Sequence, residues 1–306
     1  MNLVYFEAIP KSKETAMIEH PYQDLSGGRG LAGNLHAHTT SSDGQRDHQA
    51  VIDDYVGRGH GFLMISDHDI YTSVEDYEKY DAQGMVMVPG NEVSANGPHM
   101  LHVGAKDWVE PNADRQQVID EVNASGGGII LFNHPNWHAN FNHCPQELFE
   151  RCEGYVGLEI YNGVISRLEG SPYATNRWDM LLTQGRRLWG FAHDDSHAVT
   201  GDVGLGWNMV YVKDETVEGV VEALRAGRFY ASTGVEINAI EVEGNKIRIE
   251  TENASRIVAL KRGAIRCGVG DGRKLEIEVP EDAGYVRFEC WGAGEGFAWT
   301  QPFFCS

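Results

Sequence analysis

The chain has 306 residues, of which 42% are hydrophobic, and its 45 acidic and 25 basic residues give a formal net charge of −20. This length suits one large domain, or a domain of roughly 200–250 residues with a small one beside it, and the apolar content supports a real core. The negative charge argues against a nucleic acid polymer held on a basic surface. The negative charge would also repel an anionic substrate at long range, unless bound metal ions made the charge around the binding site positive.

Nothing in the sequence points to secretion or to membrane insertion. Residues 1–10 lack the basic start and long apolar stretch of a signal peptide, and no apolar run approaches the ~20 residues of a membrane span. The five cysteines are odd in number and include no C-x-x-C pair, which argues against a zinc ribbon or a disulfide framework. We therefore expect a cytoplasmic protein that has no membrane partner.

In chain order, residues up to about 226 alternate short apolar segments with segments of helical periodicity. Expected strands lie at residues 3–7, 29–35, 61–66, 85–89, 100–104, 128–132, 155–161 and 187–192. Expected helices lie at residues 47–56, 73–83, 113–124, 172–184 and 216–226. Because strand-helix-strand repetition at this spacing joins parallel strands through helical crossovers, we predict an α/β fold.

Beyond the last expected helix the pattern changes. Short alternating segments, separated by turns rich in Gly, Asn and Asp, follow at residues 235–242, 246–251, 256–262, 274–279 and 285–291. This pattern predicts an antiparallel β module. We place the α/β domain at residues 1–230 and the β module at residues 231–306. Because the module supplies few candidate ligands, we expect it to be structural or to mediate oligomerisation.

The residues able to bind metal follow the expected strands. His36 and His38 lie two apart at a strand end, so their side chains project from the same face, and Asp43 returns on the next loop. Two imidazoles and a carboxylate suit a divalent transition metal. In a barrel of parallel strands the C-terminal strand ends form one rim, where side chains distant in sequence converge. Further residues of this kind lie at the ends of later strands, namely His68, Glu92, His134, Asp195 and His197, and His99 lies at the start of the strand expected at residues 100–104.

An open doubly wound sheet also binds ligands at strand ends, but usually through a Gly-rich phosphate loop between a strand and a helix. The sequence has no G-x-x-x-x-G-K, and its one G-x-G-x-x-G, at residues 28–33, overlaps the expected strand at residues 29–35. Each metal-binding motif alone is weak. Together and in order, over about residues 31–235, they resemble the PHP (polymerase and histidinol phosphatase) family of metal-dependent phosphoesterases. The motifs are His36-x-His38, Asp43, Ser66-Asp-His68, Gly90-Asn-Glu92, His99, His134-Pro135 and Asp195-x-His197.

The resemblance implies a distorted (β/α)7 TIM-like barrel with two or three divalent metal ions at a trinuclear site. The nine implied ligands are His36, His38, Asp43, His68, Glu92, His99, His134, Asp195 and His197. Such mixed nitrogen and oxygen donors fit Zn, Mn or Fe better than Mg or Ca, which prefer oxygen. Glu92 is the best candidate to bridge two metals, because a carboxylate has two oxygens to share.

One ligand position is ambiguous. His102 lies three residues after His99 and would point to the opposite face of a strand, and the family pattern aligns better with His99, which we choose. His138 and His143 lie in a loop rich in Asn and aromatic residues, where they could form a pocket wall or simply be surface residues. Glu159 ends a strand and could face the site, although the nine-residue pattern does not need it.

Three residues are candidates for substrate chemistry. His193 and His197 could protonate a leaving group. Arg177 is the cation we would place beside an anionic substrate, although an arginine on a helix surface explains it equally well.

We expect hydrolysis of a phosphate ester of a small metabolite or nucleotide by metal-activated water. No Gly-x-Ser-x-Gly motif is present to supply a side-chain nucleophile. One alternative is a related metallohydrolase acting on a carbamate, an amide or another ester, because the same chemistry would serve. Another is a non-catalytic metal-binding scaffold. The natural substrate, the native metal and self-association stay open at this point.

Overall fold

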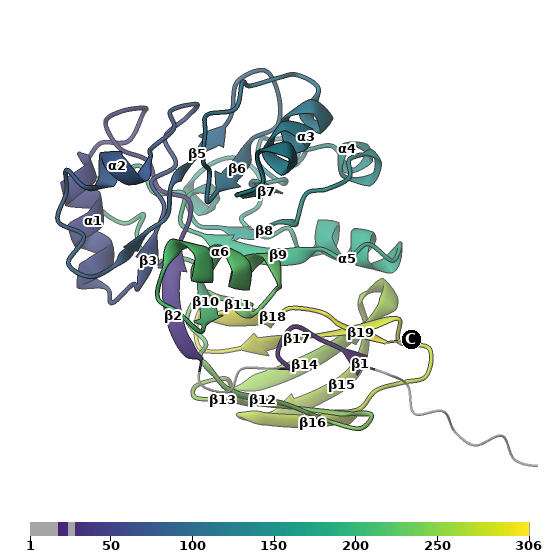
Figure 1. The fold of residues 1–306 in the computed structure, drawn as a ribbon. Helices are drawn as coiled ribbons and strands as arrows, with labels where there is room; N and C mark the ends of the chain where they lie inside the picture. Colours follow the sequence, from purple (N-terminus) through teal and green to yellow (C-terminus); the bar gives the residue numbers. More distant parts are fainter. Residues whose placement is uncertain (1–17, 24–27, 306) are drawn as a thin grey trace, which may run out of the picture.

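The protein is described by a computed structural model over residues 18–23 and 28–305. The strand expected at residues 3–7 lies outside the described residues. Figure 1 shows the α-helices beside β2–β9, while the C-terminal part consists of strands and one short 3-10 turn. The molecule is therefore a mixed α/β protein, as predicted.

Two sheets carry the strands of the first part. The first runs through β2 (Arg29–Asn34), β3 (Phe62–Leu63) and β4 (Val86–Met87), which are parallel. The second has the order β5 (Gly90–Val93), β6 (Met100–Val103), β7 (Ile129–Phe132), β8 (Gly157–Asn162) and β9 (Trp189–His193). Isolated parallel bridges link the two sheets, one between Ala37 and Ser196, just past the ends of β2 and β9, and one between His68, just past β3, and Glu92 within β5. The same ends carry the predicted metal ligands.

The prediction of parallel strands throughout is wrong for part of the second sheet. Strand β6 pairs antiparallel with both β5 and β7. Only residues 94–99 join β5 to β6, which is too short for a crossover helix, so the chain turns back on itself. Strands β7, β8 and β9 are parallel, as expected.

The helices begin with local caps that the sequence encodes. The side chains of Asp47, Ser73, Asp114 and Thr216 each accept a backbone N–H at a helix start. The helical elements of the first part are α1 (His48–Gly57), α2 (Val74–Tyr77), α3 (Arg115–Ser125), α4 (Gln146–Arg151), the 3-10 turn η1 (Val164–Arg167), α5 (Thr175–Thr183) and α6 (Val217–Arg225). The expected helix at residues 73–83 is thus a single turn, and α4 was not predicted. None of the described helices is long and apolar enough to cross a membrane.

The C-terminal strands are antiparallel, as predicted, and they join one of the sheets above. Strand β10 (Trp207–Val212) pairs with β2 on one side and with β11 (Phe229–Ser232) on the other. The sheet continues through β18 (Phe297–Thr300), β17 (Tyr285–Trp291), β19 (Phe303–Cys305) and β1 (Ile18–Glu19), with β14 (Arg256–Lys261) and β15 (Ile265–Asp271) attached to β17.

A separate antiparallel sheet contains β12 (Ile237–Glu243), β13 (Lys246–Thr251) and β16 (Lys274–Glu278), and the 3-10 turn η2 (Arg262–Ala264) joins β14 to β15. All five cysteines are free thiols, consistent with the expected absence of a disulfide framework. The domain boundary between residues 230 and 231 stays a prediction.

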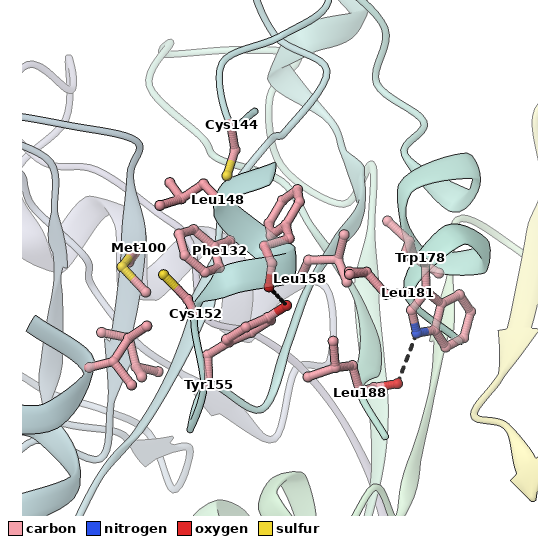
Figure 2. Packing of buried hydrophobic residues seen from close by; sticks show 14 of the residues in the cluster. Met100, Phe132, Cys144, Leu148, Cys152, Tyr155, Leu158, Trp178, Leu181 and Leu188 are labelled. Carbon is pink, nitrogen blue, oxygen red and sulfur yellow. Dashed lines mark hydrogen bonds between the residues drawn. The ribbon is translucent and has the colours of Figure 1, made fainter. Parts of the chain in front are cut away.

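A buried apolar cluster supports the strands that carry the site. Figure 2 shows Phe132 of β7 beside Tyr155, and Trp178 of α5 beside Leu188, all within this cluster. The buried polar atoms of this cluster are paired: the Tyr155 hydroxyl donates to the Phe149 carbonyl at 2.9 Å, and the Trp178 indole donates to the Leu188 carbonyl at 2.8 Å. Fully burying each large apolar side chain contributes about 1.5–3 kcal/mol. The cluster therefore holds β7 and β8 firmly in place.

Candidate metal centre

The structure brings all nine predicted ligands together. They fall into overlapping groups whose ligand atoms lie within 4.8 Å of one another. These groups are His38–Asp43–His68–His197, His36–Glu92–His134, His36–His38–Asp195 and His99–His134–His143. The sharing of His36, His38 and His134 between groups shows that the sites are contiguous.

Glu92, on β5, lies at the centre of the histidines. Its Oε1 is 3.2 Å from both His36 Nε2 and His99 Nδ1, and its Oε2 is 2.7 Å from His68 Nδ1. Full burial favours the neutral acid, but the surrounding histidines, His99 and His36 first, hold the pKa of Glu92 well below its usual range. An ionised carboxylate with different histidines around each oxygen is suited to bridging two metal ions, as the sequence predicts.

Asp195 is held at the end of β9 in a backbone conformation that non-glycine residues rarely adopt, with φ of 55°. Its Oδ1 lies 3.2 Å from both His36 Nε2 and His38 Nε2. His134, the ligand that follows β7, also has a positive φ, of 25°. Backbone strain of this kind tends to persist at functional sites, where the surrounding structure imposes it.

The outer ligand group is centred on Asp43. Its Oδ1 lies 3.3 Å from His197 Nε2 and 3.6 Å from His68 Nε2. Burial of His68 opposes its protonation, but the Asp43 and Glu92 carboxylates raise the pKa of this imidazole to about 10. The same negative field would stabilise a metal cation between these side chains.

Several buried ligand atoms have no hydrogen-bond partner, which tests whether the residues fit metal ions. Burying a polar atom without a partner costs free energy, so most proteins avoid it. Nitrogen atoms and carboxylate oxygens that converge without hydrogen bonds to one another are suited to binding metal. The residues present therefore fit bound metal ions. The atoms without a hydrogen bond that face other predicted ligands include His36 Nε2, His38 Nε2 and Asp195 Oδ1.

Glu159, on β8, supports the ligands from behind. Its Oε1 lies 2.7 Å from His36 Nδ1, and its Oε2 accepts the backbone N–H of His134 at 2.7 Å. The carboxylate thus fixes the orientation of the His36 ring and leaves Nε2 for a metal. The sequence analysis named Glu159 as a residue at a strand end that could face the site, but nothing local predicts which distant side chains it meets.

His193 belongs to this supporting layer. Its side chain is completely buried, and its Nδ1 lies 2.8 Å from Glu159 Oε1. It does not line the cavity described next. The structure therefore gives no support to its predicted role as a proton donor to a leaving group.

A cavity of about 280 Å³ opens onto the ligands. His197 lines it, whereas Arg177 does not. The Arg177 guanidinium instead donates to Asn136 Oδ1 at 2.9 Å and to the Phe141 carbonyl at 2.9 Å, so it fastens the loop after His134. The predicted contact of Arg177 with substrate is thus not supported. The residues that line the cavity besides the predicted ligands are Gln45, Trp137, Val164, Ile165, Arg167 and Leu168.

The structure also places the remaining candidate histidines. His102 lies apart from the ligand groups, completely buried, and both its ring nitrogens lack partners. Burial lowers the pKa of His102 to about 4. His99, not His102, is therefore the residue beside Glu92, in agreement with the choice made from the sequence. The Nε2 of His143 accepts the backbone N–H of His99 at 3.0 Å, and its Nδ1 lies 3.2 Å from His138 Nε2. These two loop histidines thus support His99.

Comparisons with known proteins bear on the fold. No family model matches the sequence, and no curated protein matches it either. A crystal structure from Bacteroides vulgatus, of a two-domain protein containing a predicted PHP-like metal-dependent phosphoesterase, is similar over 95% of this chain and 99% of that chain, with a TM-score of 0.55 and 17% identity. A second, an amidohydrolase from Chromobacterium violaceum with bound sulfate and no metal, covers 56% of this chain and 89% of that chain, with a TM-score of 0.42 and 16% identity. The first likeness confirms the predicted resemblance at the level of the fold.

Proposed function

We propose that this protein is a metal-dependent hydrolase that cleaves phosphate esters of small molecules. The observation that carries the proposal is the convergence of nine His, Asp and Glu side chains at or near strand ends, among them His36, His38 and Asp195, each with a buried atom that faces other ligands and makes no hydrogen bond. A dead or purely structural site would have no physical reason to keep these atoms unpaired. Seven of the nine predicted ligands, all except His36 and His38, line a cavity of about 280 Å³, which suits a small substrate.

Bound metal ions would neutralise the phosphoryl oxygens and lower the pKa of the attacking water. The protein itself holds the ligands in place. Glu92 and Asp195 supply negative charge between the histidines, and Glu159 keeps the His36 Nε2 free. His197 lies with its Nδ1 2.8 Å from the Asp195 carbonyl, which can only accept, so the ring proton sits on Nδ1 and Nε2 is free to bind. His197 therefore acts as a ligand rather than as the proton donor.

For the fold, we propose that strands β2, β3 and β5–β9 form the distorted (β/α)7 barrel implied by the family resemblance. The isolated bridges Ala37–Ser196 and His68–Glu92 support this, because they link the two sheets at both junctions of such a ring. We further propose that Zn, Mn or Fe is the native metal, that the protein acts in the cytoplasm and that it binds no nucleic acid polymer. Self-association stays open.

The test combines metal analysis with an activity assay. Protein purified without chelator is analysed for metal by mass spectrometry, and hydrolysis of p-nitrophenyl phosphate is followed after Mn or Zn is added back. We expect two or three metals per chain and metal-dependent release of phosphate. Asp195→Asn should lose both metal and activity, whereas the exposed control Glu153→Gln should keep both.

Each contrary result has a distinct meaning. Metal without phosphatase activity, but with metal-dependent cleavage of a carbamate or amide, would favour the related metallohydrolase. Metal without any hydrolysis would favour a binding scaffold. If the protein bound no metal under any condition, the whole proposal would fail.

A further inference from the structure

The cavity beside the ligands has two different sides. One side consists of the predicted metal ligands, and the other is built largely by one short segment, residues 163–168, which includes η1. This segment supplies Val164, Ile165, Arg167 and Leu168 to the cavity, and Trp137 adds a further apolar surface. Three aliphatic side chains and an indole next to the ligands form a predominantly apolar wall.

The segment is tied to the strand that carries Asp195. The backbone N–H of Gly163 donates to the His193 carbonyl at 2.8 Å, and that of Val164 donates to the Asp194 carbonyl at 2.9 Å. A Cβ at residue 163 would lie 2.7 Å from the Leu205 Cβ and 3.0 Å from the Asp194 carbonyl oxygen, so only glycine allows this approach. The apolar wall therefore has a fixed position relative to the ligands.

Arg167 is held in place next to this wall. Its Nε and Nη2 donate to the two oxygens of Asp202 at 3.0 and 2.7 Å, a bidentate arrangement that fixes the guanidinium plane. Asp202 also accepts the backbone N–H groups of His197 and Ala198, which places the pair beside the last ligand motif. The Arg167 side chain is still 48% exposed. Among the described residues that line the cavity, it is the one lysine or arginine.

We propose that residues 163–168 are the substrate-recognition segment, and that the substrate is a phosphate monoester of a compact apolar or aromatic alcohol. The inference rests on the proposed function. Ile165, Leu168 and Trp137 would contact the alcohol part, and the free edge of the Arg167 guanidinium would bind a phosphoryl oxygen. A sugar phosphate would leave its hydroxyl groups without partners against this wall.

The test uses metal-loaded enzyme and three alkyl monoesters whose leaving groups have similar reactivity: benzyl phosphate, n-butyl phosphate and glycerol 3-phosphate. We expect kcat/KM to be at least about tenfold higher for the first two, since discrimination by an apolar pocket typically reaches this size. Leu168→Asn should reduce the preference to near unity. Met180→Asn is the matched control, because Met180 lies on α5 outside the cavity and is 45% exposed, against 43% for Leu168.

A second variant tests the arginine. Arg167→Gln should raise KM about tenfold for all three esters and leave the metal content unchanged, and Arg167→Lys should recover part of the loss. Similar metal-dependent hydrolysis of all three esters would overturn the inference and leave the proposed function standing. An unchanged KM in Arg167→Gln would show that Arg167 does not bind the phosphoryl group, and this part of the inference would be wrong. No hydrolysis of any phosphate ester by metal-loaded enzyme would instead overturn the proposed function.

Discussion

The Oε1 atom of Glu159 lies 2.7 Å from the Nδ1 atom of His36, although the two residues are 123 positions apart in the chain. Both side chains are completely buried. A carboxylate only accepts hydrogen bonds, so the His36 proton must sit on Nδ1. This contact decides which nitrogen of the first ligand faces the metal position.

Replacing Glu159 should weaken metal binding. In the wild-type protein the N–H groups of His134 and Asn162 donate to the Glu159 carboxylate. In Glu159→Gln the charge is lost, and the amide group would place its own donors beside these N–H groups. Loss of such a supporting contact typically costs 10–100-fold in metal affinity. Competition with a chromophoric chelator would measure this, with Glu153→Gln as the exposed control. Unchanged affinity in Glu159→Gln would show that the carboxylate does not act on the ligand.

Arg177→Ala should loosen the loop that follows His134, because the guanidinium fastens this loop through Asn136 and Phe141. We expect faster amide hydrogen exchange over residues 136–143 and a moderately higher KM, because Trp137 in this loop lines the cavity. The metal content should not change. If KM rose sharply while exchange in the loop stayed the same, direct contact of Arg177 with substrate would be the better explanation.

The buried His102 should make the metal-free protein less stable in mild acid. Its pKa is about 4 when folded, below the ordinary value of 6.5, so the unfolded chain binds its proton more readily. The stabilising effect of the neutral ring is thus complete above pH 6.5 and is lost as pH falls from 6.5 toward 4. For this pKa shift, we expect the free energy of unfolding to fall by about 2–3 kcal/mol between pH 7 and pH 4.5.

Urea denaturation of the chelator-treated protein at pH 7 and pH 4.5 would measure this loss. His102→Leu removes the titrating group while keeping an apolar side chain in the same buried position. The difference in unfolding free energy between the two pH values should therefore be smaller in His102→Leu by about the amount above. An equal difference in both proteins would mean that His102 is not responsible.

A buried ion pair connects α5 to the C-terminal strands. Arg287, on β17, donates from Nε and Nη2 to the two oxygens of Asp179 at 2.8 and 2.6 Å, and both side chains are almost completely buried. Arg287→Leu should destabilise the fold by about 3–5 kcal/mol, because it leaves the Asp179 charge buried without its partner.

The double variant Asp179→Leu/Arg287→Leu should recover much of this stability, since the buried Asp179 charge is then absent. Glu289, which also pairs with Arg287, is 17% exposed and loses this partner in the single and the double variant alike. Denaturant midpoints of the single and double variants would measure the effect, and metal affinity should be the same in all of them. A double variant as unstable as Arg287→Leu would mean that lost packing, rather than the unpaired charge, dominates.

The ligands could be predicted from the sequence because each of them lies close to an apolar strand, so a short local pattern reveals it. Glu159 and Arg167 could not be predicted in this way. The role of Glu159 depends on a contact with His36 across the fold, and Arg167 belongs to a 3-10 turn that has no periodic pattern. Its charge made Arg177 a reasonable candidate for binding an anionic substrate. The direction of its side chain, however, depends on how the loop after His134 folds back onto α5.

The same distinction between local patterns and contacts of distant residues applies to the fold. Alternating apolar segments predicted most of the strands and the mixed α/β class, because burial on one or both faces imposes the pattern. The antiparallel position of β6 and the pairing of β10 with β2 depend on which strands become neighbours. Strands β2 and β10 are more than 170 residues apart, so no local pattern could reveal that they pair.

Strand β2, which leads into His36 and His38, is an interior strand of the largest sheet, since it is hydrogen-bonded to β3 on one side and to β10 on the other. Its backbone amides cannot open to solvent by fraying from an edge. We therefore expect the slowest-exchanging amides of the protein to include those just before the first two ligands, with protection close to the global free energy of unfolding. In that case the metal centre and the C-terminal strands would lose their structure in one cooperative transition.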